Sequence, residues 1–158
     1  MARMLKEVVA LLNRLIQLDH DAIEACKGAM DRVAQGDDRA QLGWMLSDHR
    51  RHADELAFVV RNLGGDPASH GDLRQVLSRG KVALGALAGE RAVLEAVRSS
   101  EAEAVAAYAA AVSQPGVPVD VSAVLEKQLA DERRHHAWLS ARLDAARPTR
   151  ERPPPSSR

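Results

Sequence analysis

Apolar residues recur at helical spacing through four stretches of the chain, and glycine and proline separate these stretches. The pattern predicts helices over about residues 3–34, 38–63, 90–113 and 118–146. Asp37 or Asp38 is expected to cap the second helix, and Pro118 suits a first-turn position of the last one. Gly64 is a natural stop for the second helix.

The segment between the second and third helices is much longer than the other connections. Residues 66–89 form this connector, and a short helix is expected within it over about residues 72–87. Short loops make each flanking helix pair an antiparallel hairpin, so the connector must cross from one hairpin to the other. The sequence therefore predicts an all-α fold, an antiparallel four-helix bundle over residues 1–146 with a long crossover between the second and third helices. Residues 147–158, rich in proline, serine and arginine, are predicted to be a disordered tail.

The two predicted hairpins repeat one another. Residues 46–56 read LSDHRRHADEL and residues 129–139 read LADERRHHAWL, with six identities at an offset of 83. Each copy lies on the second helix of its hairpin. This repeat favours a duplicated helical hairpin.

Each predicted apolar stripe is interrupted near its middle by ionisable residues. They are Asp19; His49 and His52; Glu101; Glu132 and His135. Counted from the hairpin turns at about 1.5 Å per residue, these residues fall within one or two helical turns of the same height. Because an unpaired buried charge costs several kcal/mol, such a layer needs mutual pairing or a cation.

The spacing of these residues suits metal ligation. Glu132 and His135 stand at i and i+3, so both side chains can face one ion. Carboxylates and imidazoles together suit iron, manganese or zinc, and the layer has room for one or two ions. Without a metal, Asp19 would instead pair with a core arginine or histidine, and His49 would bond to Glu101 or Asp19.

Composition argues against several other classes of protein and of site. The formal net charge is zero and aromatic residues are 3% of the chain, which disfavours nucleic-acid binding. The single cysteine, Cys26, excludes an intramolecular disulfide and is expected to be a small buried apolar group. No apolar run is long enough for a membrane span or a signal peptide, so a cytoplasmic protein is expected. Four arginines, at positions 50, 51, 133 and 134, are expected to form a solvated face with intrahelical pairs.

Several of these segments resemble a known superfamily. They are LNRLIQLDHDAIEA at 12–25, DHRRHADEL at 48–56, LGGDP at 63–67, SSEAEAVAAY at 99–108 and LEKQLADERRHHAWL at 125–139. Through them the chain resembles the ferritin-like superfamily in its short, rubrerythrin-like form over about residues 10–146. It is especially similar to an uncharacterised bacterial four-helix-bundle family.

The resemblance implies a di-iron site built from two glutamates and two Glu-x-x-His pairs. The ERRH segment at 132–135 and Glu101 match that pattern, whereas His49 and Asp19 stand where glutamate is usual. Tyr108 keeps the spacing of a tyrosine that hydrogen-bonds near the metals, and Cys26 replaces its counterpart in the first hairpin. Asp48, four residues before His52, is a candidate to compensate for the missing carboxylate.

The resemblance further implies oxidation of ferrous ions by dioxygen or peroxide, or peroxide reduction, although whether the chain is an enzyme is left open. The alternative is a metal-free structural or stress-associated interaction module that has lost this chemistry. The LDHDAIEA segment at 18–25 also resembles hemerythrin-like bundles, but their His-x-x-x-His pair is absent. Metal ions are the expected partners, a homodimer is left open, and neither nucleic acid nor membrane is expected.

Overall fold

A computed structural model describes residues 1–69 and 89–146, and these residues form an all-α four-helix bundle. The helices are α1 (Ala2–Met30), α2 (Asp37–Asn62), α4 (Glu90–Val112) and α5 (Val119–Ala145). The predicted helices are confirmed, and the largest difference is that α1 ends four residues earlier than expected. The predicted helix at 72–87 and the predicted tail at 147–158 lie outside the described residues.

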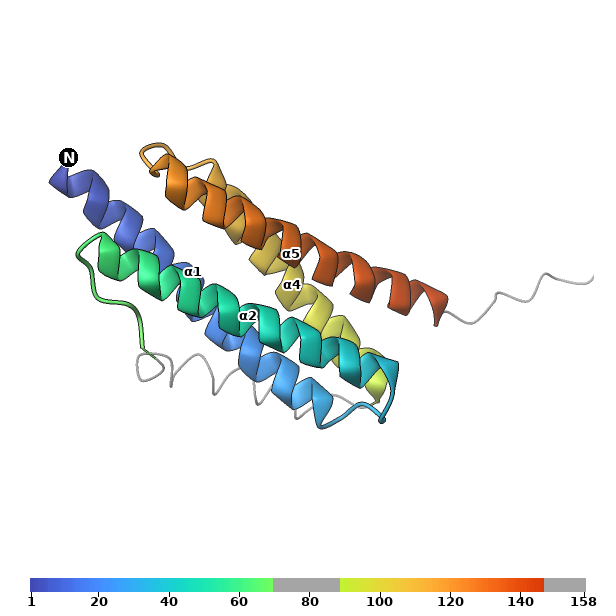
Figure 1. The fold of residues 1–158 in the computed structure, drawn as a ribbon. Helices are drawn as coiled ribbons and strands as arrows, with labels where there is room; N and C mark the ends of the chain where they lie inside the picture. Colours follow the sequence, from blue (N-terminus) through green and yellow to red (C-terminus); the bar gives the residue numbers. More distant parts are fainter. Residues whose placement is uncertain (70–88, 147–158) are drawn as a thin grey trace, which may run out of the picture.

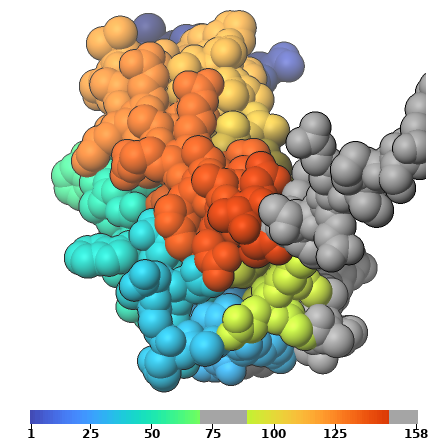
Figure 2. Space-filling view, turned by 90° about the vertical axis from the view of Figure 1, so that its right-hand side faces the viewer, coloured from blue at the N-terminus to red at the C-terminus, as the bar shows by residue number. Residues whose placement is uncertain are grey.

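The helices pair as two antiparallel hairpins, α1 with α2 and α4 with α5 (Figure 1). The hairpins then meet through α1 against α4 and α2 against α5, so each helix has two main neighbours. In the space-filling view α5 (orange to red) lies between α4 (yellow) and α2 (green to cyan) (Figure 2). This four-sided arrangement brings the middle of every helix to one central layer.

Two separate hydrophobic clusters fill the interior of the bundle, one toward each end. The first includes Ile23, Met45, Leu94 and Leu139, and the second includes Leu12, Leu56, Tyr108 and Leu125. Every helix contributes to both clusters, and the ionisable residues predicted from the sequence lie between them along each helix. The apolar clusters therefore hold the four helices in register around a polar middle.

The end of α2 follows from its glycines. Gly64 has a φ of +77°, which costs glycine little but strains other residues. The amide of Gly65 donates to the carbonyl of Val60, and the amide of Gly64 donates to the carbonyl of Arg61. These two bonds are those of a Schellman motif, which stops the helix where the sequence predicted.

The start of α2 differs from the sequence expectation. Gly36 is the N-cap residue and no side chain caps this end, so the prediction that Asp37 or Asp38 caps the helix is wrong. Both aspartates lie in the first turn, where their charge complements the helix dipole. Asp38 also accepts a hydrogen bond from Arg142 of α5 at 2.7 Å. Pro118 is likewise the N-cap residue of α5 rather than a first-turn residue.

Within the described residues, no helix is long and apolar enough to cross a membrane.

Substitution of a glycine within α2 and of one just after its end should change stability in opposite directions. Gly64→Ala should lower the free energy of unfolding by about 1–2 kcal/mol, because alanine is strained at positive φ. Gly43→Ala should raise it by about 0.5–1 kcal/mol, because position 43 is mid-helix and the new methyl group would meet only Met30 at an ordinary 3.7 Å. Urea denaturation followed by circular dichroism measures both, and equal signs would contradict this account of the helix end.

Candidate metal centre

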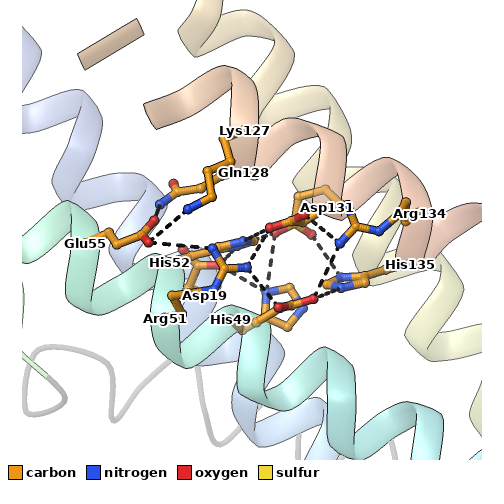
Figure 3. Close-up of polar contacts among 12 residues, drawn as sticks. Asp19, His49, Arg51, His52, Glu55, Lys127, Gln128, Asp131, Arg134 and His135 are labelled. Carbon is orange, nitrogen blue, oxygen red and sulfur yellow. Dashed lines mark hydrogen bonds and ion pairs between the residues drawn. The ribbon is translucent and has the colours of Figure 1, made fainter. Parts of the chain in front are cut away.

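The six residues that interrupt the apolar stripes come together in one buried layer, here called the polar layer. Its members are Asp19 of α1, His49 and His52 of α2, Glu101 of α4, and Glu132 and His135 of α5. None is more than 3% exposed. Figure 3 shows several of these side chains pointing toward one another from the facing helices.

Helical spacing explains why these charged residues point inward. Asp19 lies between Ile16 and Ile23, and Glu101 lies between Val97 and Tyr108, at intervals of three, four or seven residues. Residues at these intervals share one helix face. Packing of the apolar neighbours into the two clusters therefore carries the charged side chains into the core.

His49 lies at the centre of the polar layer. Its Nδ1 is 3.0 Å from Oδ1 of Asp19, and its Nε2 is 3.1 Å from Oε1 of Glu101. Nδ1 is also 3.5 Å from Oε1 of Glu132. One imidazole thus contacts carboxylates from the three other helices.

His52 and His135 are held in a reciprocal way across the α2–α5 contact. His52 directs Nδ1 to Glu132 at 3.0 Å and Nε2 to Asp131 at 2.9 Å. His135 directs Nδ1 to Glu101 at 3.3 Å and Nε2 to Asp48 at 3.0 Å. Asp131 of α5 therefore holds His52 of α2, and Asp48 of α2 holds His135 of α5. Asp48 and Asp131 are here called the outer aspartates. The sequence placed Asp48 on the same helix face as His52. In the structure Asp48 contacts His135, which is the counterpart of His52 in the repeat.

Arginines contact the aspartates on the surface side of the polar layer. Their place beside this layer was not predicted from the sequence. Nη2 of Arg51 donates to Asp48 at 2.8 Å and to Asp131 at 2.7 Å, and Arg134 lies 2.6 Å from the other oxygen of Asp131 (Figure 3). The intrahelical pairs of Arg51 and Arg134 are confirmed, but Arg51 also joins α2 to α5. Asp131 was missed as a site residue, although the repeat that matches it to Asp48 carried the signal.

The three histidines of the polar layer are surrounded by carboxylates at both ring nitrogens. Burial lowers the pKa of each ring, but the hydrogen bonds and charges of the carboxylates outweigh burial. The pKa rises to about 9 for His52 and for His135, and well above its usual value for His49. Without a metal, the imidazoles are therefore protonated at neutral pH and donate from both nitrogens.

The same contacts stabilise the charged form of the carboxylates. Burial raises the pKa of Asp19 and Glu101, but their histidine partners lower it further, so both pKa values lie below the usual range. The hydroxyl of Tyr108 donates to Oδ2 of Asp19 at 2.6 Å, and burial together with the Asp19 charge raises the tyrosine pKa well above its usual value. Tyr108 thus stays protonated and orients Asp19.

Two groups of ligand atoms in the described part of the chain can hold a metal ion. One, called set A, is Asp19, His49, His52 and Glu132; the other, set B, is His49, Glu101, Glu132 and His135. In each set the ligand atoms lie within 4.8 Å of one another. All six predicted ligands belong to at least one set, whereas Asp48 and Tyr108 belong to neither.

One atom of the layer supports the fit of a metal. Oε2 of Glu132 is buried and has no hydrogen-bond partner among the described residues, and Nδ1 of His135 lies 3.8 Å from it. A buried carboxylate oxygen without a partner is costly. A cation between these residues would satisfy it, and the mixed oxygen and nitrogen donors suit a transition ion.

Cys26 lies outside both sets. Its side chain is fully buried in the first hydrophobic cluster, and burial raises its thiol pKa to about 12. The thiol is therefore neutral and packs as a small apolar group.

Comparison with known proteins gives a family and no activity. A family model described as a domain of unknown function (DUF2383) matches residues 7–114, which is more than half of the chain. No curated protein matches the chain.

Replacement of Arg51 should lower the free energy of unfolding more than replacement of the neighbouring Arg50. Arg51→Ala should lower the free energy of unfolding by about 1–2 kcal/mol, because it removes charged hydrogen bonds to two aspartates at a partly exposed site. Arg50→Ala, at an exposed position, should stay within about 0.5 kcal/mol of the original protein. Denaturant unfolding of both variants measures the difference, and equal effects would contradict the bridging role of Arg51.

The metal-free protein should lose stability as the pH rises above neutrality. The protonated rings of His52 and His135 contribute fully below the ordinary pKa of 6.5, and this contribution is lost as the pH rises through about 9. Unfolding in the presence of a chelator at pH 6.5 and 9 measures the loss. His135→Gln should reduce the pH dependence. A flat profile in the original protein would contradict the protonation of these two histidines.

Proposed function

The chain belongs to the DUF2383 family, whose description assigns no activity, and from the buried layer we propose that it is a ferritin-like protein that binds transition-metal ions in its bundle core. The sequence segments that resemble rubrerythrin-like bundles support this proposal. Their candidate ligands, predicted from spacing alone, lie in one layer of the fold.

The observation that carries the proposal is the pair of four-residue ligand sets at the centre of the bundle. Both sets combine two histidines with two carboxylates, and both share His49 and Glu132. A carboxylate pair neutralises a divalent ion, and neutral imidazoles add nitrogen ligands without further charge. Tyr108, Asp48 and Asp131 then hold the ligands in place from outside.

The proposed reaction is oxidation of ferrous ions by dioxygen or peroxide, or reduction of peroxide. A bound iron ion would supply the one-electron chemistry. The protein would supply the ligands and exclude bulk water through the apolar clusters on either side. Manganese and zinc suit the same ligands, and zinc would give a structural site without redox chemistry.

A second candidate function is a metal-free helical bundle that acts as a structural or interaction module. The observation in its favour is that the layer can balance its charge without an ion. The five carboxylates of Asp19, Asp48, Glu101, Asp131 and Glu132 face three protonated imidazoles and the guanidinium groups of Arg51 and Arg134. Five negative and five positive charges sum to zero.

Replacement of Glu132, which both sets share, separates the two candidates. The purified chain, stripped with chelator and reconstituted with Fe(II), Mn(II) or Zn(II), should retain metal on analysis after desalting. Glu132→Gln keeps the side-chain volume but removes the charge, so metal retention should fall at least about tenfold. Glu126→Gln, at an exposed position of the same helix, is the matched control and should retain metal normally.

The oxidation of Fe(II) in air, followed by absorbance, should be faster with the original protein and Glu126→Gln than with Glu132→Gln. Circular dichroism checks that all three remain folded. If the original protein retains no metal, the result would contradict the metal-binding proposal and favour the metal-free bundle. Metal retention without faster oxidation would keep the metal site and reject the redox activity.

A further inference from the structure

His49 stands at the junction of the two ligand sets and gives them different nitrogens. Nδ1 faces Asp19 and Glu132 in set A, and Nε2 faces Glu101 in set B. The inference drawn from this position rests on the proposed metal binding and concerns how many ions bind and where.

An imidazole and a carboxylate differ in what they offer to two neighbouring ions. A neutral imidazole has one lone-pair nitrogen and one N–H, so it accepts an ion on one side and donates a hydrogen bond on the other. A carboxylate has two acceptor oxygens and can serve both sides. In two-metal sites the ions lie only about 3.5–4 Å apart, which carboxylates bridge readily. A histidine at position 49 therefore opposes simultaneous occupation of both sets.

The distances favour set A. The rings of His49 and His52 each approach Asp19 Oδ1 and Glu132 Oε1, with nitrogen–oxygen distances of 3.0, 3.5, 3.6 and 3.0 Å. Four ligand atoms at about 2.0–2.1 Å from a tetrahedral ion lie about 3.3 Å from one another. The four distances bracket this value, and all the ligand atoms of set A lie within 4.8 Å of one another, so set A has the dimensions of a four-coordinate site for one ion.

The surroundings of set A complete the arrangement. With His49 ligating through Nδ1, its Nε2–H donates to Glu101, and the Nε2–H of His52 donates to Asp131. Tyr108 holds the second oxygen of Asp19. Histidine ligands in metal sites are commonly oriented by such carboxylates. Oε1 of Glu132 faces both rings, and Oε2 of the same carboxylate has no partner among the described residues, which is a second sign of a missing ligand at Glu132.

We propose that the core binds one divalent ion at a time, in four-coordinate geometry, between Asp19, His49, His52 and Glu132. Two carboxylates balance the charge of the ion. Glu101 and His135 then form a buried ion pair beside the ion, and Arg51 and Arg134 balance the outer aspartates. The centre thus departs from the two-ion site that the resemblance implies.

The internal repeat provides a matched pair of variants, since His52 and His135 are counterparts at an offset of 83. Co(II) and Zn(II) are titrated into metal-free original protein, His52→Gln and His135→Gln, with circular dichroism to check folding. We expect one ion per chain in the original protein and in His135→Gln, and at least about a tenfold loss of affinity in His52→Gln. Bound Co(II) should show the intense visible absorption of four-coordinate geometry.

The outcomes separate this inference from the proposed function. Two ions per chain, or an ion lost in His135→Gln but retained in His52→Gln, would overturn the inference and leave metal binding intact. A weak six-coordinate Co(II) spectrum would overturn the proposed geometry. No bound ion in the original protein would overturn both proposals.

Replacement of the central histidine gives a gain-of-function test. His49→Glu places a carboxylate, whose two oxygens can serve two ions, at a position that both sets share, and it creates a second Glu-x-x-His pair with His52. The number of ions per chain should rise from one to two in the same titration. A folded His49→Glu variant that still binds only one ion would show that His49 does not limit occupancy, which contradicts the inference.

Discussion

The charges buried in the middle of this bundle must be neutralised, and the contacts of the polar layer depend on this constraint. Carboxylates in an apolar interior cost several kcal/mol each unless they are paired. Every carboxylate of the polar layer contacts an imidazole, and the outer aspartates also contact guanidinium groups. Protons on the histidines or a metal ion between them can supply the balancing charge, so proton binding and metal binding compete for the same atoms.

The repeat gives this layer its approximate symmetry, and the substitution at position 49 disturbs that symmetry at the centre. Asp48 and Asp131 hold each other's histidine across the α2–α5 contact, as expected for two copies of one motif facing each other. Glu132 has His49 as its counterpart, so one copy offers a carboxylate at the centre and the other an imidazole. The first hairpin also has Asp19 in place of a glutamate and Cys26 in place of a tyrosine. Because an imidazole cannot serve two ions as a carboxylate does, the difference at His49 has the largest effect on metal binding.

Much of the fold and of the candidate site could be predicted from the sequence, because both depend on local spacing. The helices follow from apolar periodicity, and Asp19, Glu101 and Glu132 were recognisable as polar interruptions of apolar stripes. Arg51 and Asp131 could not be recognised in this way, because their spacing is that of a solvated helix face. The expected aspartate cap of α2 failed because Gly36 takes the cap position and Asp38 pairs with Arg142 of another helix.

The sequence by itself determined which residues face the core, since a helix repeats its faces every three or four residues. It also determined the height at which the charged residues meet, since the rise per residue is constant. Only the tertiary structure decided the partners: that His49 joins Asp19 to Glu101, that each outer aspartate crosses to the opposite helix, and that Arg51 links both. These contacts join residues up to 87 positions apart, so they depend on how the hairpins pack rather than on local spacing.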